Sequence, residues 1–264
     1  MNLLDVLIWR RLRDGGGGGG GGAATLAAVL ALGNDANGAR IVGLAAPVGA
    51  GDAATKGYID AELHPFAISS FTMAVTSREV GQSLPTPAFT AAYSSAPTTA
   101  TLTDSEGGSK DVSATPTAFS SNGTFSRSVP SQTAVFTLNA TQTGAPAPAP
   151  LTRTATWLAR RMYGAAIDPG SYTGAFVNGL ATQALSASKT GSFAVAPSAG
   201  QSVFFAVLSS FSLVQTDFTV SGLPFGISKV GDPIAVTNGF GVTLNYQLWR
   251  SDNTGLGSLT FVVA

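Results

Sequence analysis

The sequence of 264 residues contains no cysteine, a single histidine and few charged residues. Without cysteine the chain can form neither a disulfide framework nor a thiol site, so packing must provide its stability. The charged fraction is 11% and the formal net charge is zero. Binding of nucleic acid or of an anionic membrane surface needs clustered lysine and arginine. We therefore expect no nucleic-acid partner.

Long apolar runs are also missing, since no stretch approaches the roughly 20 apolar residues of a membrane-spanning helix. The first 14 residues place their apolar patch before their arginines, which reverses the charge order of a secretory signal peptide. We therefore expect no membrane insertion and a chain that is soluble or bound to a particle.

The sequence offers little material for a catalytic or metal site. His64 is the only histidine and has no nucleophile motif nearby, so it is interpreted as a capping or hinge residue. The acidic residues Asp104, Glu106 and Asp111 lack the spacing of a calcium loop and are interpreted as a solvated hairpin. We expect no catalytic residue, no cofactor and no metal. The enzymatic alternative is a glycan depolymerase with paired carboxylates, but this chain is too short for the large repeat folds of such enzymes.

Residues 1–22 are predicted to form an anchor peptide and a glycine leash. Residues 1–14 fit a short amphipathic helix, and the uninterrupted glycines 15–22 form the most flexible backbone available. In this interpretation the helix enters an apolar groove on another protein. The alternative is that it packs on its own domain. The expected docking residues are Leu4, Leu7, Ile8 and Trp9.

Residues 23–64 are predicted to form a helix, an extended arm and a second helix. An Ala- and Leu-rich helix ends near Gly33, an apolar run ends near Pro47, and Asp52 is suited to cap the second helix. About 40 residues of this kind cannot bury enough apolar surface to be stable alone, so we expect association with other copies. The expected oligomerisation residues are Leu26, Val29, Leu30, Ile41, Leu44, Tyr58 and Ile59.

Three short motifs follow one another in this segment: GNDA at 33–36, IVGLAAP at 41–47 and DAATKGYID at 52–60. In this order they resemble a segment that recurs in fibre, collar and baseplate proteins of tailed bacteriophages. The resemblance implies a position where fibre chains trimerise or attach to the particle. It thus implies a homotrimer located in the virion, with other virion structural proteins as partners.

From about residue 65, helix signals give way to short β-branched and aromatic runs separated by Gly, Pro, Ser and Asn. Their spacing predicts a mainly β chain with two immunoglobulin-like β-sandwich domains, 65–163 and 164–264. Residues 176–185 are expected to carry a helical turn or two. The expected strands are 68–76, 88–93, 98–102, 123–129, 133–139 and 152–163 in the first domain, and 192–195, 202–208, 217–220, 227–237, 241–250 and 258–264 in the second.

Further motifs lie in or next to these strands, among them Glu79-Val80-Gly81, Met162-Tyr163-Gly164 and the run 245–251 (NYQLWRS). They resemble phage virion proteins that carry immunoglobulin-like modules, which implies a structural protein. The alternative is an adhesin that binds a host-surface glycan. In that case Tyr172 or Trp249 could stack on sugars, although an aromatic residue on a strand is more often part of the core.

Overall fold

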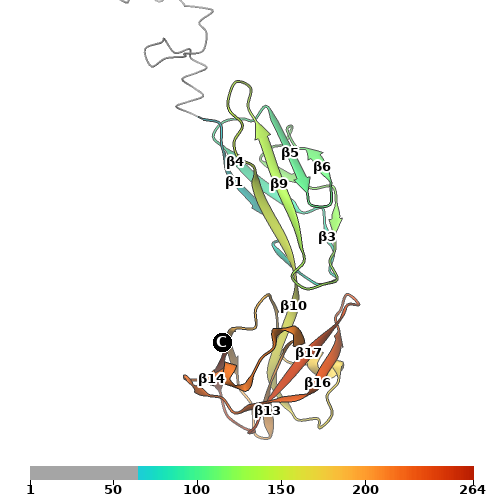
Figure 1. The fold of residues 1–264 in the computed structure, drawn as a ribbon, viewed down its shortest axis with the longest axis vertical. Helices are drawn as coiled ribbons and strands as arrows, with labels where there is room; N and C mark the ends of the chain where they lie inside the picture. Colours follow the sequence, from blue (N-terminus) through green and yellow to red (C-terminus); the bar gives the residue numbers. More distant parts are fainter. Residues whose placement is uncertain (1–64) are drawn as a thin grey trace, which may run out of the picture. The chain divides into compact units, whose positions relative to one another are not determined.

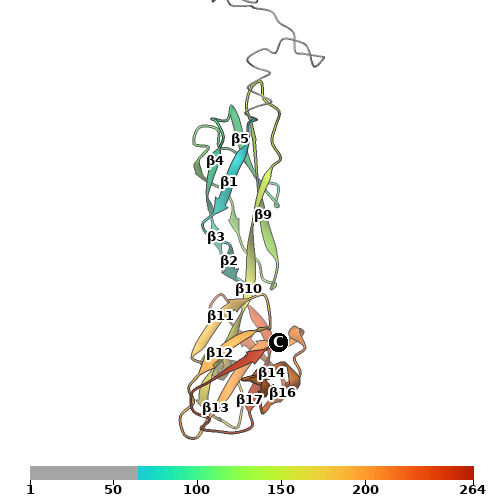
Figure 2. The same cartoon turned by 90° about the vertical axis from the view of Figure 1, so that its left-hand side faces the viewer.

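The computed structural model describes residues 65–264, which are mainly β-strand (Figures 1 and 2). We call residues 65–158 the N-terminal β region and residues 159–264 the C-terminal β region. Among the described residues, no helix has the length and apolar character needed to span a membrane.

The N-terminal β region contains nine strands and the first half of a tenth. They are β1 (Ile68–Met73), β2 (Ser77–Glu79), β3 (Leu84–Pro85), β4 (Ala88–Tyr93), β5 (Thr99–Asp104), β6 (Ser109–Asp111), β7 (Ala118–Ser120), β8 (Thr124–Phe125), β9 (Thr133–Thr141) and β10 (Leu151–Ile167).

The C-terminal β region holds the second half of β10 and the remaining elements. They are α4 (Gly174–Asn178), β11 (Thr182–Ser186), β12 (Gly191–Val195), β13 (Gln201–Leu208), η1 (Ser209–Phe211), η2 (Gln215–Asp217), β14 (Phe218–Val220), β15 (Leu223–Pro224), β16 (Ile227–Thr237), β17 (Thr243–Ser251) and β18 (Leu259–Val263).

Two sheets enclose the core of the N-terminal β region. One has the strand order β1-β4-β7, and the other runs β10-β9-β5-β6. Their inward side chains form one apolar cluster, in which the ring of Phe89 from the first sheet lies 5.0 Å from that of Phe136 in the second. Along β9 the buried residues alternate with exposed or half-buried ones, which is the two-residue period of a strand with one buried face.

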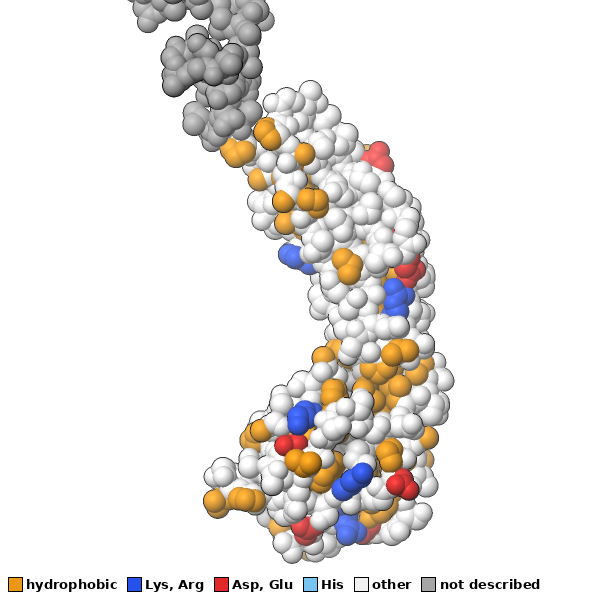
Figure 3. All heavy atoms as spheres, in the orientation of Figure 1, with side chains coloured by type: hydrophobic (Ala, Val, Ile, Leu, Met, Phe, Trp, Pro, Cys, Tyr) orange, Lys and Arg blue, Asp and Glu red, His pale blue; other side chains and the backbone are white. Residues whose placement is uncertain are grey.

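The outward positions of the same sheet are mostly threonines. In register, Thr99 lies opposite Thr141, and Thr103 lies opposite Thr137. The hydroxyls of Thr99 and Thr141 are 2.6 Å apart. Threonine suits strands because its branched side chain packs on a pleated surface, and its hydroxyl keeps that surface polar without charge. The side of the N-terminal β region that is visible in Figure 3 accordingly carries few charged side chains.

Strand β10 belongs to both β regions. Residues 151–156 pair with β9, and residues 156–158 pair in parallel with β2. Further along, residues 159–163 pair with β11 and residues 162–167 pair with β13. A single nine-stranded sheet therefore continues through the molecule (Figures 1 and 2), and the boundary expected at 163/164 falls inside this strand.

The C-terminal β region covers both faces of its main sheet, β16-β17-β13-β10. On one face, Phe205 of β13 packs in a cluster with residues of the second sheet, β12-β18-β14-β15. On the other face, its neighbour Phe204 packs in a cluster with Val177 of α4. Residues 202–208 of β13 are consequently all buried. This explains why the strand is a continuous apolar run rather than an alternating one.

The long predicted strands are present, whereas several short ones were not expected from the sequence. These are β2, β3, β6, β7, β11 and β15. The prediction of a helical turn is confirmed for α4, where the side chain of Thr173 accepts a hydrogen bond from Phe176 N. It is wrong for residues 182–185, because β11 pairs there with β10. The strand expected over 123–129 is reduced to the two residues of β8.

Candidate functional site at the junction of the two β regions

The junction centres on the residues that end and follow β2. Val80 is fully buried, and its N–H donates to Leu158 O at 3.1 Å. Gly81 has a φ of +84°, which favours glycine. A Cβ atom on Gly81 would lie 2.6 Å from Val242 Cγ2 and 2.9 Å from Phe240 Cβ. Residue 81 must therefore be glycine for the loop between β16 and β17 to reach it.

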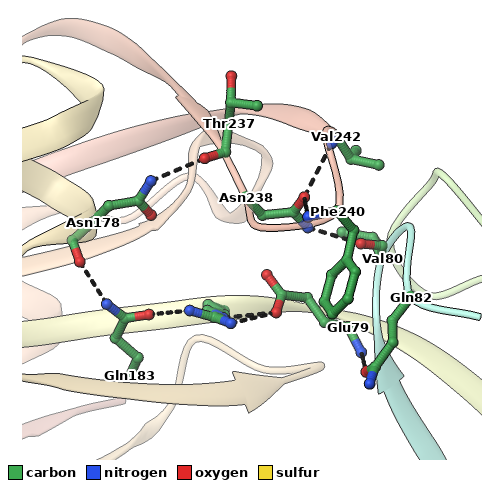
Figure 4. Close-up of polar contacts among 10 residues, drawn as sticks. Glu79, Val80, Gln82, Asn178, Gln183, Thr237, Asn238, Phe240 and Val242 are labelled. Carbon is green, nitrogen blue, oxygen red and sulfur yellow. Dashed lines mark hydrogen bonds and ion pairs between the residues drawn. The ribbon is translucent and has the colours of Figure 1, made fainter.

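That loop is held by one amide side chain, Asn238 (Figure 4). Its Oδ1 accepts hydrogen bonds from the N–H groups of Phe240 and Val242, both at 3.0 Å. Its Nδ2 donates to Val80 O at 2.7 Å. Asn238 thus shapes the turn and at the same time attaches it to the N-terminal β region. Val242 and Leu244 pack against the core of that region.

An ion pair connects β2 with β10. The side chain of Glu79 is only 6% exposed, and its Oε2 accepts from Nε of Arg160 at 2.8 Å and from NH2 of the same guanidinium at 2.6 Å. Removing Arg160, whose side chain is 36% exposed, would leave the carboxylate of Glu79 without a counter-charge at a site that is only 6% exposed. The pair therefore requires the two strands to keep their relative position.

From Arg160 a chain of hydrogen bonds continues into the C-terminal β region (Figure 4). Its guanidinium donates to Gln183 Oε1 on β11. Gln183 Nε2 donates to Asn178 O at 2.6 Å, and Asn178 Nδ2 donates to Thr237 O at 2.9 Å. The chain links β2, β10, β11, α4 and β16, so most elements near the junction are connected to it.

Two aromatic residues complete the junction. Trp157 of β10 is fully buried, and its Nε1 donates to Gln82 O at 2.7 Å. Tyr246 of β17 is 4% exposed. Burial, followed by the nearby negative charge of Glu79, raises the pKa of Tyr246 to about 12. The phenol therefore stays neutral over the physiological pH range.

The junction fixes the orientation of one β region relative to the other. Its polar side chains have hydrogen-bond partners within the protein. The carboxylate of Glu79 is paired with the guanidinium of Arg160, and the side-chain amides bond to backbone groups. Within residues 65–264 there is no group of three or more His, Cys, Asp or Glu side chains that could hold a metal. The arrangement therefore supports a mechanical role: hydrogen bonds and an ion pair couple the N-terminal β region to the C-terminal β region.

The structure places some of the residues singled out in the sequence. Asp104 accepts from Glu106 N at 2.9 Å, as expected for a hairpin turn, and Asp111 accepts from Ser113. Trp249 is 3% exposed and therefore belongs to the core rather than to a sugar-stacking surface. Tyr172 is half-buried, and its hydroxyl donates to Asp168 at 2.7 Å.

The other expected residues lie outside the described part of the chain. They are His64, the docking residues Leu4, Leu7, Ile8 and Trp9, and the oligomerisation residues Leu26, Val29, Leu30, Ile41, Leu44, Tyr58 and Ile59.

Sequence reasoning missed the junction residues. Glu79-Val80-Gly81 stood out only through a resemblance. The Asn238-Gly239 pair, a frequent turn dipeptide between two apolar runs, is a signal that could have indicated the β16–β17 hairpin. No local pattern indicates that Asn238 bonds to Val80, because the two are 158 residues apart in the chain.

Comparison of the chain with protein-family models, with curated proteins and with solved structures gives no match.

Proposed function

We propose that the chain is a structural protein of a tailed bacteriophage particle, a fibre, collar or baseplate component located in the virion. Residues 1–64 would anchor it to other virion proteins and join three copies, and the two β regions would be displayed. The observation that carries this proposal is the junction: β10 is shared, and Gly81, Asn238 and the Glu79–Arg160 pair fix the two β regions to each other. A displayed spacer needs such a fixed connection.

The strand order supports an immunoglobulin-like assignment for the N-terminal β region. Immunoglobulin domains place strands A, B and E in one sheet and C, F and G in the other. Here β1, β4 and β7 take the positions of A, B and E, and β5, β9 and β10 take those of C, F and G. Sheets of this kind serve widely as spacers in extracellular and particle-bound proteins.

We confine that assignment to the N-terminal β region. In the C-terminal β region the last strand, β18, lies between β12 and β14, and α4 covers a face of the main sheet. This order differs from that of immunoglobulin domains. We describe this part as a two-sheet module with a helical cover, and its role in the proposal is display.

The surface composition also supports a role in a particle. Only 11% of the residues are charged, and most outward positions on β5 and β9 are threonines. A surface of neutral hydroxyls depends little on ion pairs, so its interactions change little with salt concentration. That property suits a protein exposed to variable extracellular media.

The proposal is tested by locating the protein. Antibodies raised against the full chain should label intact purified particles in electron micrographs, and light scattering of the purified chain should give three times the monomer mass. Deletion of residues 1–22 should leave an assembly of three chains and abolish incorporation into particles. Labelling of host cells but not of particles would disprove the proposal.

The expectations that the chain is not an enzyme and has no cofactor, nucleic-acid partner or membrane insertion stay predictions. The alternative function, an adhesin for a host-surface glycan, also stays a prediction.

A further inference from the structure

Asparagine followed directly by glycine recurs in this chain, and the described part contains three such pairs. They are Asn122-Gly123, Asn178-Gly179 and Asn238-Gly239, while Asn37-Gly38 lies outside the described residues. In such a pair the backbone nitrogen of the glycine can attack the side-chain amide carbon of the asparagine, because glycine has no side chain to obstruct the approach. Whether this reaction occurs depends on how the fold holds the two groups.

The fold holds the amide of Asn238 in place (Figure 4). Its Oδ1 accepts from the N–H groups of Phe240 and Val242, and its Nδ2 donates to Val80 O at 2.7 Å. The amide carbon therefore cannot turn toward the nitrogen of Gly239 unless these three hydrogen bonds break.

The pair Asn178-Gly179 is held at both of its reacting groups. Asn178 Nδ2 donates to Thr237 O at 2.9 Å. The N–H of Gly179 donates to Ala175 O at 3.0 Å and to Phe176 O at 3.1 Å, because this residue caps the end of α4. The glycine nitrogen is thus directed at helix carbonyls, and three hydrogen bonds again have to break before it can react.

The pair Asn122-Gly123, in the connection from β7 to β8, is held at neither group. The side chain of Asn122 is exposed, and among residues 65–264 its amide has no hydrogen-bond partner. Within the same range, the peptide group that joins the two residues makes no hydrogen bond through the C=O of Asn122 or the N–H of Gly123. The two reacting groups are therefore adjacent and free to meet, which is the condition for a fast intramolecular reaction.

We propose that Asn122 is a site of spontaneous deamidation. The nitrogen of Gly123 loses its proton to the solvent and forms a bond to Cγ of Asn122, and the Cγ–Nδ2 bond breaks with release of ammonia. Water then opens the resulting five-membered imide. Attack of water at Cγ leaves an aspartate, whereas attack at the main-chain carbonyl carbon leaves an isoaspartate, in which the chain runs through Cγ.

The products change the charge and the backbone at a defined place. Each conversion adds a carboxylate, which is ionised at neutral pH, to a cavity that Asp104 and Glu106 also line. Isoaspartate in addition lengthens the main chain by one carbon directly before β8, where Phe125 belongs to the core and lies opposite Leu84 of β3. This modification goes beyond the structural role and does not depend on it.

The test is incubation of the folded full chain at physiological temperature in mildly alkaline buffer, followed by proteolysis and mass spectrometry. The peptide with Asn122 should show the mass increase from amide to acid and separate into two chromatographic forms, aspartate and isoaspartate. The peptides with Asn178 and Asn238 should react about a hundredfold more slowly, since each must break three hydrogen bonds and each bond slows the reaction by about fivefold.

Two controls separate the effect of the fold from that of the sequence motif. In concentrated urea, which unfolds the chain, the three pairs should react at similar rates. Asn122→Gln keeps an exposed amide at this position, but attack on it must close a six-membered ring, so its amide should be lost far more slowly. The inference is overturned if Asn122 stays intact in the folded protein, if Asn178 or Asn238 reacts there as fast as Asn122, or if Asn122→Gln loses its amide at the wild-type rate.

Discussion

The N-terminal β region buries its apolar side chains between two sheets, whereas the C-terminal β region buries them on both faces of one sheet. In the first, β9 alternates between core residues and outward positions that are threonine or asparagine except at Val135. In the second, β13 has no outward polar position between residues 202 and 208. An alternating strand can leave one face to solvent, but a wholly apolar strand needs a cover on each side. In this molecule α4 and the second sheet provide the two covers.

The difference explains why the helix occurs only in the C-terminal β region. Val177 of α4 and Leu180 after it are buried against Phe204, Ala206 and Leu248. Without that cover, the second apolar face would be exposed to water. In the N-terminal β region the equivalent face is already polar, so it requires no covering element. The following predictions test this contrast, from the largest expected effect to the smallest.

The two covered faces should contribute separately to stability. Phe204→Ala and Phe205→Ala should each lower the free energy of unfolding by about 3–5 kcal/mol, because each removes a fully buried ring. Although they are adjacent, the two rings lie in different clusters, so the double variant should show the sum within about 0.5 kcal/mol. Urea unfolding of the four proteins measures this. A coupling energy above about 1 kcal/mol would show that the faces are not independent.

The junction should determine whether the two β regions unfold together. Gly81→Ala should destabilise the protein by about 3 kcal/mol, combining backbone strain with overpacking against Val242 and Phe240. Calorimetry should then resolve two transitions in place of one. Gly107→Ala is the control, because Gly107 has a φ of +89° with no atom within 4 Å of the added Cβ. Equal effects of both substitutions would mean that strain alone matters.

Alkaline pH should weaken the C-terminal β region through Tyr246. In the folded protein the pKa of Tyr246 is raised from 10.0 to about 12, so the folded state keeps a proton that the unfolded chain releases. This contribution is fully present below pH 10 and is lost as the pH rises through about 12, a decrease of about 2–3 kcal/mol in unfolding free energy.

The measurement is urea unfolding of the wild type and Tyr246→Phe at neutral pH and at a series of pH values above 10. The variant should lose less stability than the wild type over this series. Identical pH profiles of the two proteins would refute the assignment to Tyr246.

The smallest predicted effect concerns the amide that attaches the β16–β17 loop. Asn238→Ala leaves the buried carbonyl of Val80 without its partner and should cost about 1–2 kcal/mol. Asn253→Ala, at an exposed position, should change stability by less than about 0.5 kcal/mol. Chemical unfolding compares the two. If Asn238→Ala is as mild as Asn253→Ala, the loop is held by Val242 and Leu244 packing alone.

Most long strands could be predicted because their own residues carry the signal. Residues 133–139 alternate, and residues 203–208 are uniformly apolar. Strands of two or three residues, such as β2 and β8, carry no such signal, since their pairing depends on what lies beside them. Residues 182–185 contain Ala and Leu, which favour helix locally, but pairing with β10 overrides that preference.

The candidate sites were less predictable than the strands. Gly81 has a positive φ and lies against Phe240 and Val242 of the β16–β17 loop. That loop is distant in the sequence, so no local pattern around residue 81 predicts the contact. Asp104 and Glu106 were expected in a solvated hairpin, and the hairpin turn is present. That they also line a cavity depends on Ser121 and Asn122, which another connection brings to the same place.

The first half of β10 pairs with β9, which is synthesised before it, whereas the second half pairs with β11 and β13, which are synthesised after it. During synthesis, residues 65–158 emerge first and can close their two sheets, while β11 and β13 are still missing. At about 5–20 residues per second, the 41 residues from the end of β10 to the end of β13 take roughly 2–8 s to appear. For that period the second half of β10 is an unpaired strand edge, which favours association with other chains. The nascent protein therefore passes through a stage in which a copy on a neighbouring ribosome can supply the missing strand.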